Sequence, residues 1–206
     1  PEVEALLNNE GADYSIDLTT EPGHAVRLAA EAAFHGHEIV AAMGGDGTVN
    51  EVINGLMLAK QQGAACPALA VMGAGRGNDF AYGTGIPCSL AEDCRVLVHG
   101  RRRRIDIGRV VVDEQETPRY FGNGIGIGFD TMVGFEAATY KHLTGFGGYL
   151  VAGLKTLLFY YRPPHVRITI DGKSFSQPPL MISVMNGRGM GRGFLMCLNA
   201  FPDDGK

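Results

Sequence analysis

The sequence lacks several features that mark common protein classes. It has no basic excess, because 18 Lys and Arg residues are set against 22 Asp and Glu residues for a net charge of −4, and this charge balance disfavours a nucleic-acid-binding function. Its four cysteines form neither a C-x-x-C pair nor a His/Cys metal-ligand spacing. Free thiols in a reducing compartment are therefore expected rather than disulfides or a zinc site.

A long apolar run is also missing. The longest one, Phe146–Tyr161, contains Lys155 and is shorter than the ~20 apolar residues that a membrane-spanning helix needs. The start of the chain shows no signal-peptide pattern. We therefore expect a cytoplasmic protein that associates peripherally with membranes. Because the chain begins with Pro1 and no clear element closes it at Lys206, we expect a fragment with incomplete termini.

The most informative stretch is a glycine-rich segment in the first half of the chain. Gly44, Gly45 and Gly47 follow the apolar run Ile39–Ala42 and precede a helical pattern. A strand, a tight turn and a helix N-terminus in this order present backbone N–H groups to a phosphate, and glycine allows close approach. Asp46 in this loop would repel phosphate unless Mg²⁺ bridged the two, which predicts a nucleotide–Mg²⁺ site.

An ordinary turn is the alternative interpretation of the same segment. Thr48 and Glu51 have the spacing of a capping box, in which the threonine caps a helix and the glutamate reaches back to its start. The glycines would then serve only the turn that precedes this helix. The residues of this segment alone leave both interpretations open.

A second glycine-rich loop, Gly73–Gly77, follows another apolar run. In a parallel sheet, loops at the carboxyl ends of neighbouring strands lie at the same edge, so we expect this loop beside the first. Arg76 could neutralise phosphate oxygens, and Asp79 could reach Mg²⁺ through water. The alternative is that Asn78 and Asp79 only cap a short helix that begins at Phe80.

Two widespread nucleotide-binding motifs are absent. The segment Gly172-Lys173-Ser174 has Arg167 where a P-loop requires its first glycine. The glycines of Gly124–Gly128 have the wrong spacing for a dinucleotide-binding G-x-G-x-x-G motif. Neither a P-loop nor a Rossmann site is therefore indicated.

The two halves of the chain differ in their patterns. In the first half, helices are expected over 1–10, 23–34, 48–62 and 89–98, and strands over 14–18, 38–43 and 68–72. The second half shows strand patterns over 105–112, 120–127, 166–170 and 180–185, and one helical stretch over 134–159. We therefore expect an α/β domain with a parallel sheet over 1–102 and a β-rich domain over 103–206.

Two segments resemble the diacylglycerol kinase catalytic family, which includes bacterial lipid kinases and sphingosine kinases. Gly44–Leu56 resembles the family signature, and Gly75–Ala81 resembles its second nucleotide motif. Shorter matches follow in the family's order at Ile86-Pro87, Ile105–Gly108, Phe121–Asn123, Gly126–Asp130 and Asn186-Gly187. The resemblance covers nearly the whole chain.

This resemblance implies a fold and an activity. The fold would be a nucleotide-binding α/β domain like those of phosphofructokinase and NAD kinase, followed by a β-rich, sandwich-like domain that holds lipid. The activity would be ATP-dependent phosphorylation of a lipid hydroxyl at a membrane surface, with ATP and Mg²⁺ as cofactors. Such phosphoryl transfer depends on positioning and charge neutralisation more than on covalent chemistry.

The resemblance also assigns roles by position. Asp46 and Asp79 match the catalytic acidic pair that is linked to Mg²⁺ through water. Asp130 loosely matches the sequence position of a substrate-binding aspartate of sphingosine kinases. The nucleotide-binding positions are Thr19 on the adenine side, the phosphate loop Gly44, Gly45, Asp46, Gly47, Thr48, Val49 and Asn50, and Arg76. The implied ligands of a structural metal are the Asp204 side chain and the carbonyls of Phe201 and Lys206.

The sequence departs from the family pattern at several points. Arg76 stands where many bacterial members have threonine, Gly73 replaces a proline and Tyr82 replaces an arginine. The family's N-terminal Asn-Pro-x-Ser-Gly loop and its C-terminal Asp-Gly-Glu segment are absent. The general base is therefore expected beyond Lys206, with Asp46 as the candidate within these residues.

A lipid kinase is the function expected from these observations. A kinase for a soluble substrate, such as NAD or a sugar, and a non-catalytic nucleotide- or lipid-binding fragment are the alternatives. The sequence identifies neither the lipid that is phosphorylated nor the oligomeric state of the protein. A homodimer is one option for the oligomeric state.

Overall fold

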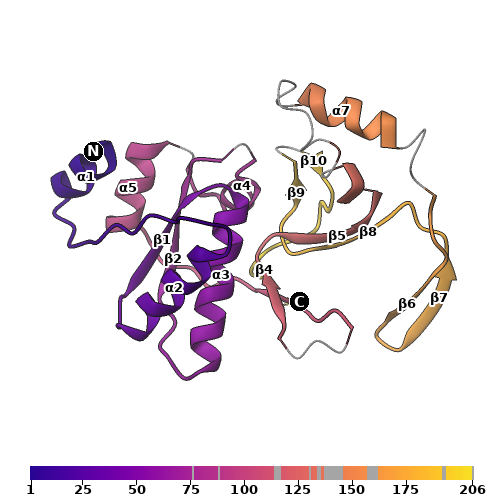
Figure 1. Ribbon diagram of the computed structural model, residues 1–206, viewed down its shortest axis with the longest axis horizontal. Helices are drawn as coiled ribbons and strands as arrows, with labels where there is room; N and C mark the ends of the chain where they lie inside the picture. The colour runs from indigo at the N-terminus through magenta and orange to yellow at the C-terminus, as the bar shows by residue number, and fades with distance from the viewer. Residues whose placement is uncertain are drawn as a thin grey trace. The chain divides into compact units, whose positions relative to one another are not determined.

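The computed structural model describes residues 1–75, 77–87, 89–113, 117–129, 131–133, 136, 146–156, 162–191 and 194–205. The chain divides into two compact units (Figure 1). The first unit consists of Pro1–Gly124 and Met185–Lys206, and the second is Ile125–Val184. The domain division at residues 102 and 103 stays a prediction.

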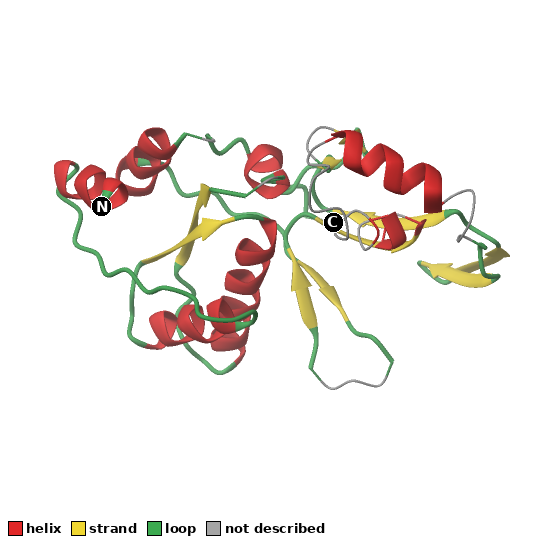
Figure 2. Cartoon of the chain, turned by 45° about the horizontal axis from the view of Figure 1, so that its top comes forward, coloured by secondary structure: helices red, strands yellow, loops and turns green. Residues whose placement is uncertain are grey.

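The first unit is built around two parallel strands with helices packed about them (Figure 2). Strands β1 (Ile39–Gly44) and β2 (Ala68–Gly73) pair in register from Ile39↔Ala68 to Gly44↔Gly73. The other elements of this unit are α1 (Glu2–Asn9), α2 (His24–Phe34), α3 (Asp46–Gln61), α4 (Asp79–Thr84), α5 (Leu90–His99), β3 (Gly108–Val110), β4 (Arg119–Phe121), β9 (Gly189–Met190) and β10 (Phe194–Leu195). The expected parallel pairing is confirmed.

Helices α2 and α3 form most of the core of the first unit. A Cβ atom on Gly55 of α3 would lie 2.2 Å from the Val26 carbonyl oxygen and 2.9 Å from Ala29 Cβ, so only glycine allows this crossing. The alanines of α2 at helical spacing face α3, which permits the close approach. The buried side chains of the two helices are Ala25, Ala29, Ala33, Val49, Val52, Ile53, Leu56 and Ala59.

Helices α1 and α5 build a second, smaller core with β2. Leu7, Met72 and Cys94 are buried there. Asp93 is 3% exposed in the same region, and its Oδ1 atom has no hydrogen-bond partner among the described residues. Burial raises the pKa of the Asp93 carboxyl, and a hydrogen bond from the Gly73 backbone opposes this shift.

One expected strand of the first unit does not form. Residues 12–20 are described and contain no strand, so the strand predicted over 14–18 is wrong. The alternating pattern does not correspond to burial here, because Leu18 is 80% exposed and Ile16 is 49% exposed. An apolar alternation without a buried face does not hold a strand in a sheet.

Helix α3 holds strand β4 through one side chain. The Asn54 amide donates from Nδ2 to the Tyr120 carbonyl at 2.9 Å, and its Oδ1 accepts from the Tyr120 N–H at 2.9 Å. The Asn54 amide thus pairs with the Tyr120 backbone as a neighbouring strand would. At the C-terminal end of the helix, Gln61 Nε2 donates to the Tyr120 hydroxyl.

The second unit contains the pair β5 (Gly124–Gly128) and β8 (Met181–Met185), the hairpin β6 (Val166–Ile170) and β7 (Lys173–Gln177), and α7 (Phe146–Lys155). The strands expected over 166–170 and 180–185 are confirmed, and β7 completes an antiparallel hairpin through Asp171 and Gly172, both at positive φ. The strand expected over 120–127 is instead divided into β4 and β5 around Gly122-Asn123. Much of the helical stretch expected over 134–159 lies outside the described residues.

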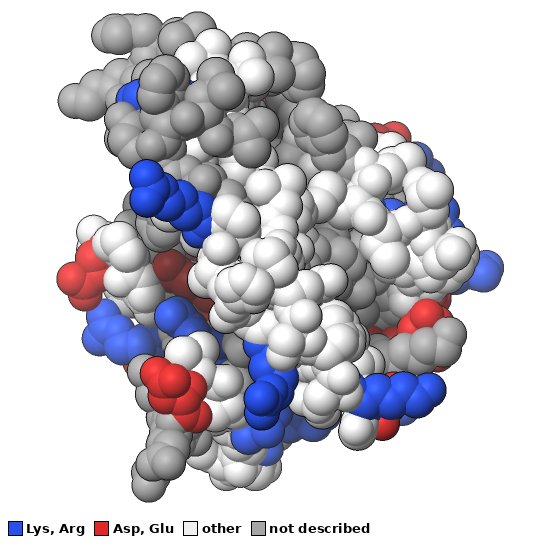
Figure 3. Space-filling view, turned by 90° about the vertical axis from the view of Figure 1, so that its right-hand side faces the viewer, with Lys and Arg blue, Asp and Glu red and all other residues white. Residues whose placement is uncertain are grey.

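The surface of the second unit carries several exposed apolar side chains. Ile170, Phe175, Leu180 and Val184 are each between 44% and 58% exposed. Figure 3 shows a broad uncharged surface with basic and acidic side chains scattered along its margins. Among the described residues, no helix has both the length and the apolar character needed to cross a bilayer.

Replacing Asn54 tests the link between α3 and β4. Asn54→Ala removes both hydrogen bonds to the Tyr120 backbone and should lower the free energy of unfolding by about 2 kcal/mol. Urea denaturation gives this value. The control is Lys60→Ala at an exposed position of the same helix, which should change stability by less than about 0.5 kcal/mol. Equal effects of the two substitutions would contradict this role of Asn54.

Asp93 should make stability depend on pH. Because its pKa is raised in the folded state, the folded carboxyl holds its proton at pH values where the unfolded one has lost it. Burial of the charge therefore leaves the free energy of unfolding unchanged below the ordinary pKa of 3.8. It lowers that free energy as the pH rises through the pKa of the folded state. Asp93→Asn should be more stable than the wild type at pH 7, with the difference shrinking towards pH 4.

Urea unfolding at several pH values measures this difference. Asp17→Asn, at an exposed position, serves as the control and should leave the pH profile unchanged. A stability difference between Asp93→Asn and the wild type that is constant with pH would show that the Asp93 charge is not the cause.

Candidate functional site

The register of β1 and β2 brings the two glycine-rich loops together. The last pair is Gly44↔Gly73, and the Ala74 N–H donates to the Gly44 carbonyl at 3.0 Å. A Cβ atom on Gly75 would lie 2.3 Å from Gly45 Cα, so the loops touch backbone to backbone. The expectation that they lie side by side at one edge of the sheet is confirmed.

The first loop leads directly into helix α3. The helix begins at Asp46, with Gly45 as an N-cap that has no side chain to offer. The predicted capping box is therefore wrong, since the helix begins before Thr48, and Glu51 instead accepts hydrogen bonds from the N–H groups of Gly23 and Ala25. The first N–H groups of a helix have no intrahelical acceptors, which favours an anion at this end.

The second loop is closed by Asn78. This residue has φ 57, in the left-handed region, where asparagine is among the few tolerated side chains. Its Oδ1 accepts from the Gly75 N–H at 2.9 Å, and its Nδ2 donates to the Gly75 carbonyl at 3.1 Å. Asn78 occupies the N-cap position of α4, but its side chain makes no capping bond to that helix.

The two loops bring Asp46 and Asp79 close to one point. A Cβ atom on Gly77 would lie 2.7 Å from Asp46 Oδ2 and 3.5 Å from Asp79 Oδ2. Asp46 Oδ1 accepts from the Phe80 N–H at 3.0 Å, which links α3 to the start of α4. Two carboxylates beside one small residue offer the oxygen ligands that Mg²⁺ prefers. These residues therefore suit a hydrated divalent cation.

A third segment reaches the same place. The Gly191 N–H donates to Asp79 Oδ2 at 2.7 Å, from the turn between β9 and β10. Gly191 has φ 67, which favours glycine. This contact was not predicted from the sequence.

Asparagines hold this third segment in place. The Asn123 carbonyl accepts from the N–H groups of Asn186 and Gly187, at 2.7 and 2.8 Å. Asn186 Nδ2 donates to the carbonyls of Gly122 and Asp106 at 2.7 and 2.8 Å. The segments around Asp106, Asn123 and Asn186, which are distant in the sequence, are thus hydrogen-bonded to one another just before the chain reaches Gly191.

Comparison with known proteins identifies the family. A profile described as "Diacylglycerol kinase catalytic domain" matches residues 1–110, and one described as "YegS C-terminal NAD kinase beta sandwich-like domain" matches residues 123–206. The chain belongs to the diacylglycerol kinase catalytic domain family. The expected fold, an α/β nucleotide-binding domain followed by a sandwich-like domain, is confirmed.

Individual relatives agree with this assignment. The chain is 34% identical over 202 residues to "Probable lipid kinase YegS" of Escherichia fergusonii, covering 97% of the chain and 64% of the relative. It is also 34% identical over 200 residues to "Probable lipid kinase YegS-like" of Chromohalobacter salexigens, covering 97% of the chain and 61% of the relative. The chain thus spans under two thirds of the length of these relatives.

A solved structure of a diacylglycerol kinase from Bacillus anthracis str. Sterne is also similar to the chain. The TM-score is 0.72 at 25% sequence identity, and the match covers 97% of this chain and 62% of that one.

The structure describes only some of the other predicted site residues. Arg76, Asp130 and Lys206 lie outside the described residues. Thr19 is exposed, on the segment that leads into α2. In the expected metal turn, the Asp204 N–H donates to the Phe201 carbonyl at 3.3 Å. Because the Lys206 carbonyl lies outside the described residues, this metal site stays a prediction.

The contact between the two loops makes a direct prediction. Gly75→Ala would place a Cβ atom 2.3 Å from Gly45 Cα, so the loops must separate. Backbone atoms cannot move aside as the end of a flexible side chain can. We therefore expect the free energy of unfolding to fall by about 1–3 kcal/mol and nucleotide binding to weaken. Urea denaturation and isothermal titration with ATP measure the two effects.

Gly47 provides the matched control. A Cβ atom there meets nothing within 4 Å, so Gly47→Ala should keep the wild-type stability. If Gly75→Ala were as stable as Gly47→Ala, the close contact between the loops would be refuted.

Proposed function

We propose that the protein is a lipid kinase that transfers the γ-phosphate of ATP to a lipid hydroxyl. The observation that carries this proposal is the meeting of the two glycine loops, with Asp46 and Asp79 beside Gly77. The similarity to relatives described as probable lipid kinases supports a lipid as the acceptor.

The phosphates of ATP would lie against the first loop. Gly44, Gly45 and Gly47 leave the backbone N–H groups accessible, and the N-terminus of α3 adds the positive end of its dipole. A Cβ atom on Gly44 would lie 2.5 Å from Thr48 Oγ1, so the Thr48 side chain packs directly against this glycine. Glycine is thus required both for the turn and for the position of Thr48.

The acidic pair would hold the metal. Mg²⁺ bound through water near Asp46 and Asp79 would offset the charge that develops on the transferring phosphoryl group. In the structure Phe80 fixes Asp46, and Gly191 fixes Asp79, by backbone hydrogen bonds. These donors orient carboxylates that would otherwise repel each other.

The acceptor would reach the site from a membrane surface. We propose that the protein acts at the cytoplasmic surface of a membrane. The exposed apolar residues of the second unit support contact with lipid. A general base would add about 10² to 10⁴-fold to the rate. Among these 206 residues, we assign that role to Asp46.

The test is a phosphorylation assay with a lipid panel. Protein containing these 206 residues is incubated with radiolabelled ATP and Mg²⁺ in mixed micelles of diacylglycerol, a sphingoid base, phosphatidylglycerol or a polyprenol. We expect label on one of these lipids, and Asp46→Asn should lower the rate by at least about 100-fold. Asn keeps the acceptor for the Phe80 N–H, so this variant should fold.

Asp13→Asn, at an exposed position, is the matched control and should keep the wild-type rate. Label on NAD or a sugar instead of lipid would show a kinase for a soluble substrate. Folded protein that binds ATP but labels no acceptor would show a non-catalytic binding protein. Either result would overturn the proposed lipid kinase activity.

A further inference from the structure

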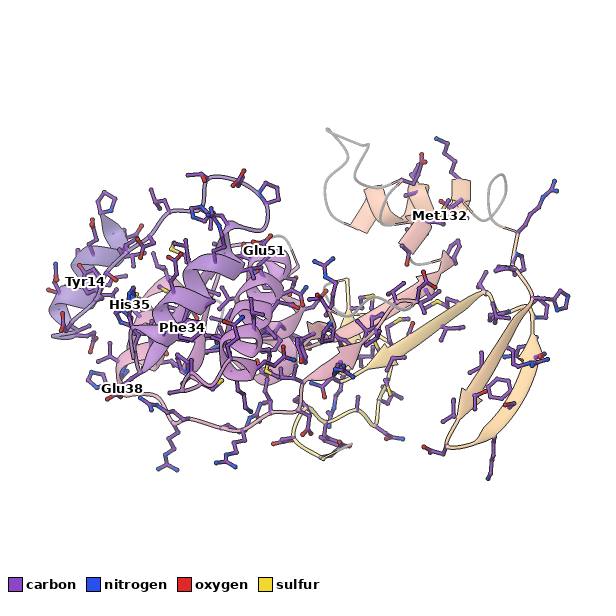
Figure 4. All side chains as sticks on the ribbon, turned by 60° about the horizontal axis from the view of Figure 1, so that its bottom comes forward. Tyr14, Phe34, His35, Glu38, Glu51 and Met132 are labelled. Atoms are coloured by element: carbon purple, nitrogen blue, oxygen red, sulfur yellow. The ribbon has the colours of Figure 1, made fainter. Side chains whose placement is uncertain are left out.

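The Glu51 side chain connects two helices of the first unit. Glu51 belongs to α3, and its Oε1 accepts from the Gly23 N–H at 2.9 Å while its Oε2 accepts from the Ala25 N–H at 3.3 Å. Figure 4 shows Glu51 beside the segment that enters α2. Both carboxylate oxygens are therefore used to hold the start of α2.

Helix α2 depends on this outside cap. Its N-cap residue is Gly23, with φ 85, which has no side chain, and its first turn contains no acidic residue. The carboxylate of Glu51 replaces the missing cap and places a negative charge at the positive end of the helix dipole. Hydrogen bonds to a charged acceptor are stronger than neutral ones, so this contact fixes the turn firmly.

A second contact on the same face of α3 makes the connection rigid. Gly55 lies one turn after Glu51, and a Cβ atom there would meet the Val26 carbonyl at 2.2 Å. The close backbone approach at Gly55 sets how near the helices lie. The Glu51 bonds then determine where α2 begins.

The segment before α2 is tied to the same turn. His24 Nδ1 accepts from the Thr20 N–H at 3.1 Å and lies 3.0 Å from Thr20 Oγ1. Thr19, the residue expected on the adenine side, directly precedes Thr20. Thr20 thus contacts His24, and the two residues that flank His24 in the chain, Gly23 and Ala25, donate to Glu51.

Glu51 also follows the phosphate loop directly. Asn50 is the last of the predicted phosphate-binding positions, so α3 carries these positions in its first turns and the Glu51 carboxylate at the position that follows them. We propose that Glu51 is a positioning residue that fixes the distance between the phosphate loop and the Thr19–Thr20 segment. This inference rests on the proposed ATP-binding function.

The consequence is a specific effect on nucleotide binding. A ligand that spans from the phosphate loop to the Thr19–Thr20 segment, such as ATP, needs this segment at the correct distance from the loop. Inorganic triphosphate occupies only the phosphate end, so it should not depend on Glu51. If Glu51 had a purely structural role, its replacement would weaken the binding of both ligands to the same degree.

The experiment compares two ligands on matched variants. Isothermal titration measures the Kd of ATP and of inorganic triphosphate, each with Mg²⁺, for wild type, Glu51→Gln and Glu31→Gln. Gln keeps the size of the side chain but leaves one oxygen acceptor for the two N–H donors. We expect Glu51→Gln to raise the Kd of ATP about ten-fold and to change that of triphosphate by less than about two-fold.

The control Glu31→Gln removes a charge from an exposed position of α2, and should match the wild type with both ligands. Equal Kd changes for both ligands, or no change for either, in Glu51→Gln would overturn the positioning role. If wild-type protein binds triphosphate but not ATP, the proposed function and this inference both fail.

A second variant and a second measurement keep the test independent of how Glu51→Gln folds. His24→Ala removes the acceptor for Thr20 and should give the same selective loss of ATP affinity. Hydrogen exchange of the Glu51→Gln protein should be faster over residues 15–25 and unchanged over β1. Unchanged ATP binding in His24→Ala would contradict the set of contacts proposed here.

Discussion

The backbone contact between Gly45 and Gly75 is the constraint on which the site depends. It exists because β1 and β2 are parallel and end in register at Gly44 and Gly73. Parallel strands place their following loops at one edge of the sheet, and only glycine permits the loops to touch. The same closeness brings Asp46 and Asp79 together from helices that follow different strands.

Helix α3 connects this site to the rest of the first unit. Its N-terminus follows the glycine turn that we propose binds phosphate, Glu51 caps α2, and Asn54 pairs with the Tyr120 backbone. These contacts come from polar side chains that reach backbone groups, whereas the apolar side chains of the helix fill the core. One helix therefore contributes to the candidate site and also positions its neighbours.

The sequence predicted the local features of the site well and its long-range contacts poorly. The glycine loops follow apolar strands, so their pairing could be inferred from the strand–loop–helix pattern. The partners of Glu51 could not, because a capping-box spacing is local, whereas the N–H groups that donate to the Glu51 carboxylate lie at the start of another helix. Gly191 was missed for the same reason, since nothing near it in the sequence indicates a bond to Asp79.

A crystal structure of the protein with Mg²⁺ and a non-hydrolysable ATP analogue tests the central claim most directly. The account predicts that the β- and γ-phosphates lie against the backbone N–H groups of Gly44–Gly47, with the metal near Asp46 and Asp79. Phosphates bound elsewhere, with the two loops still in contact and empty, would contradict it.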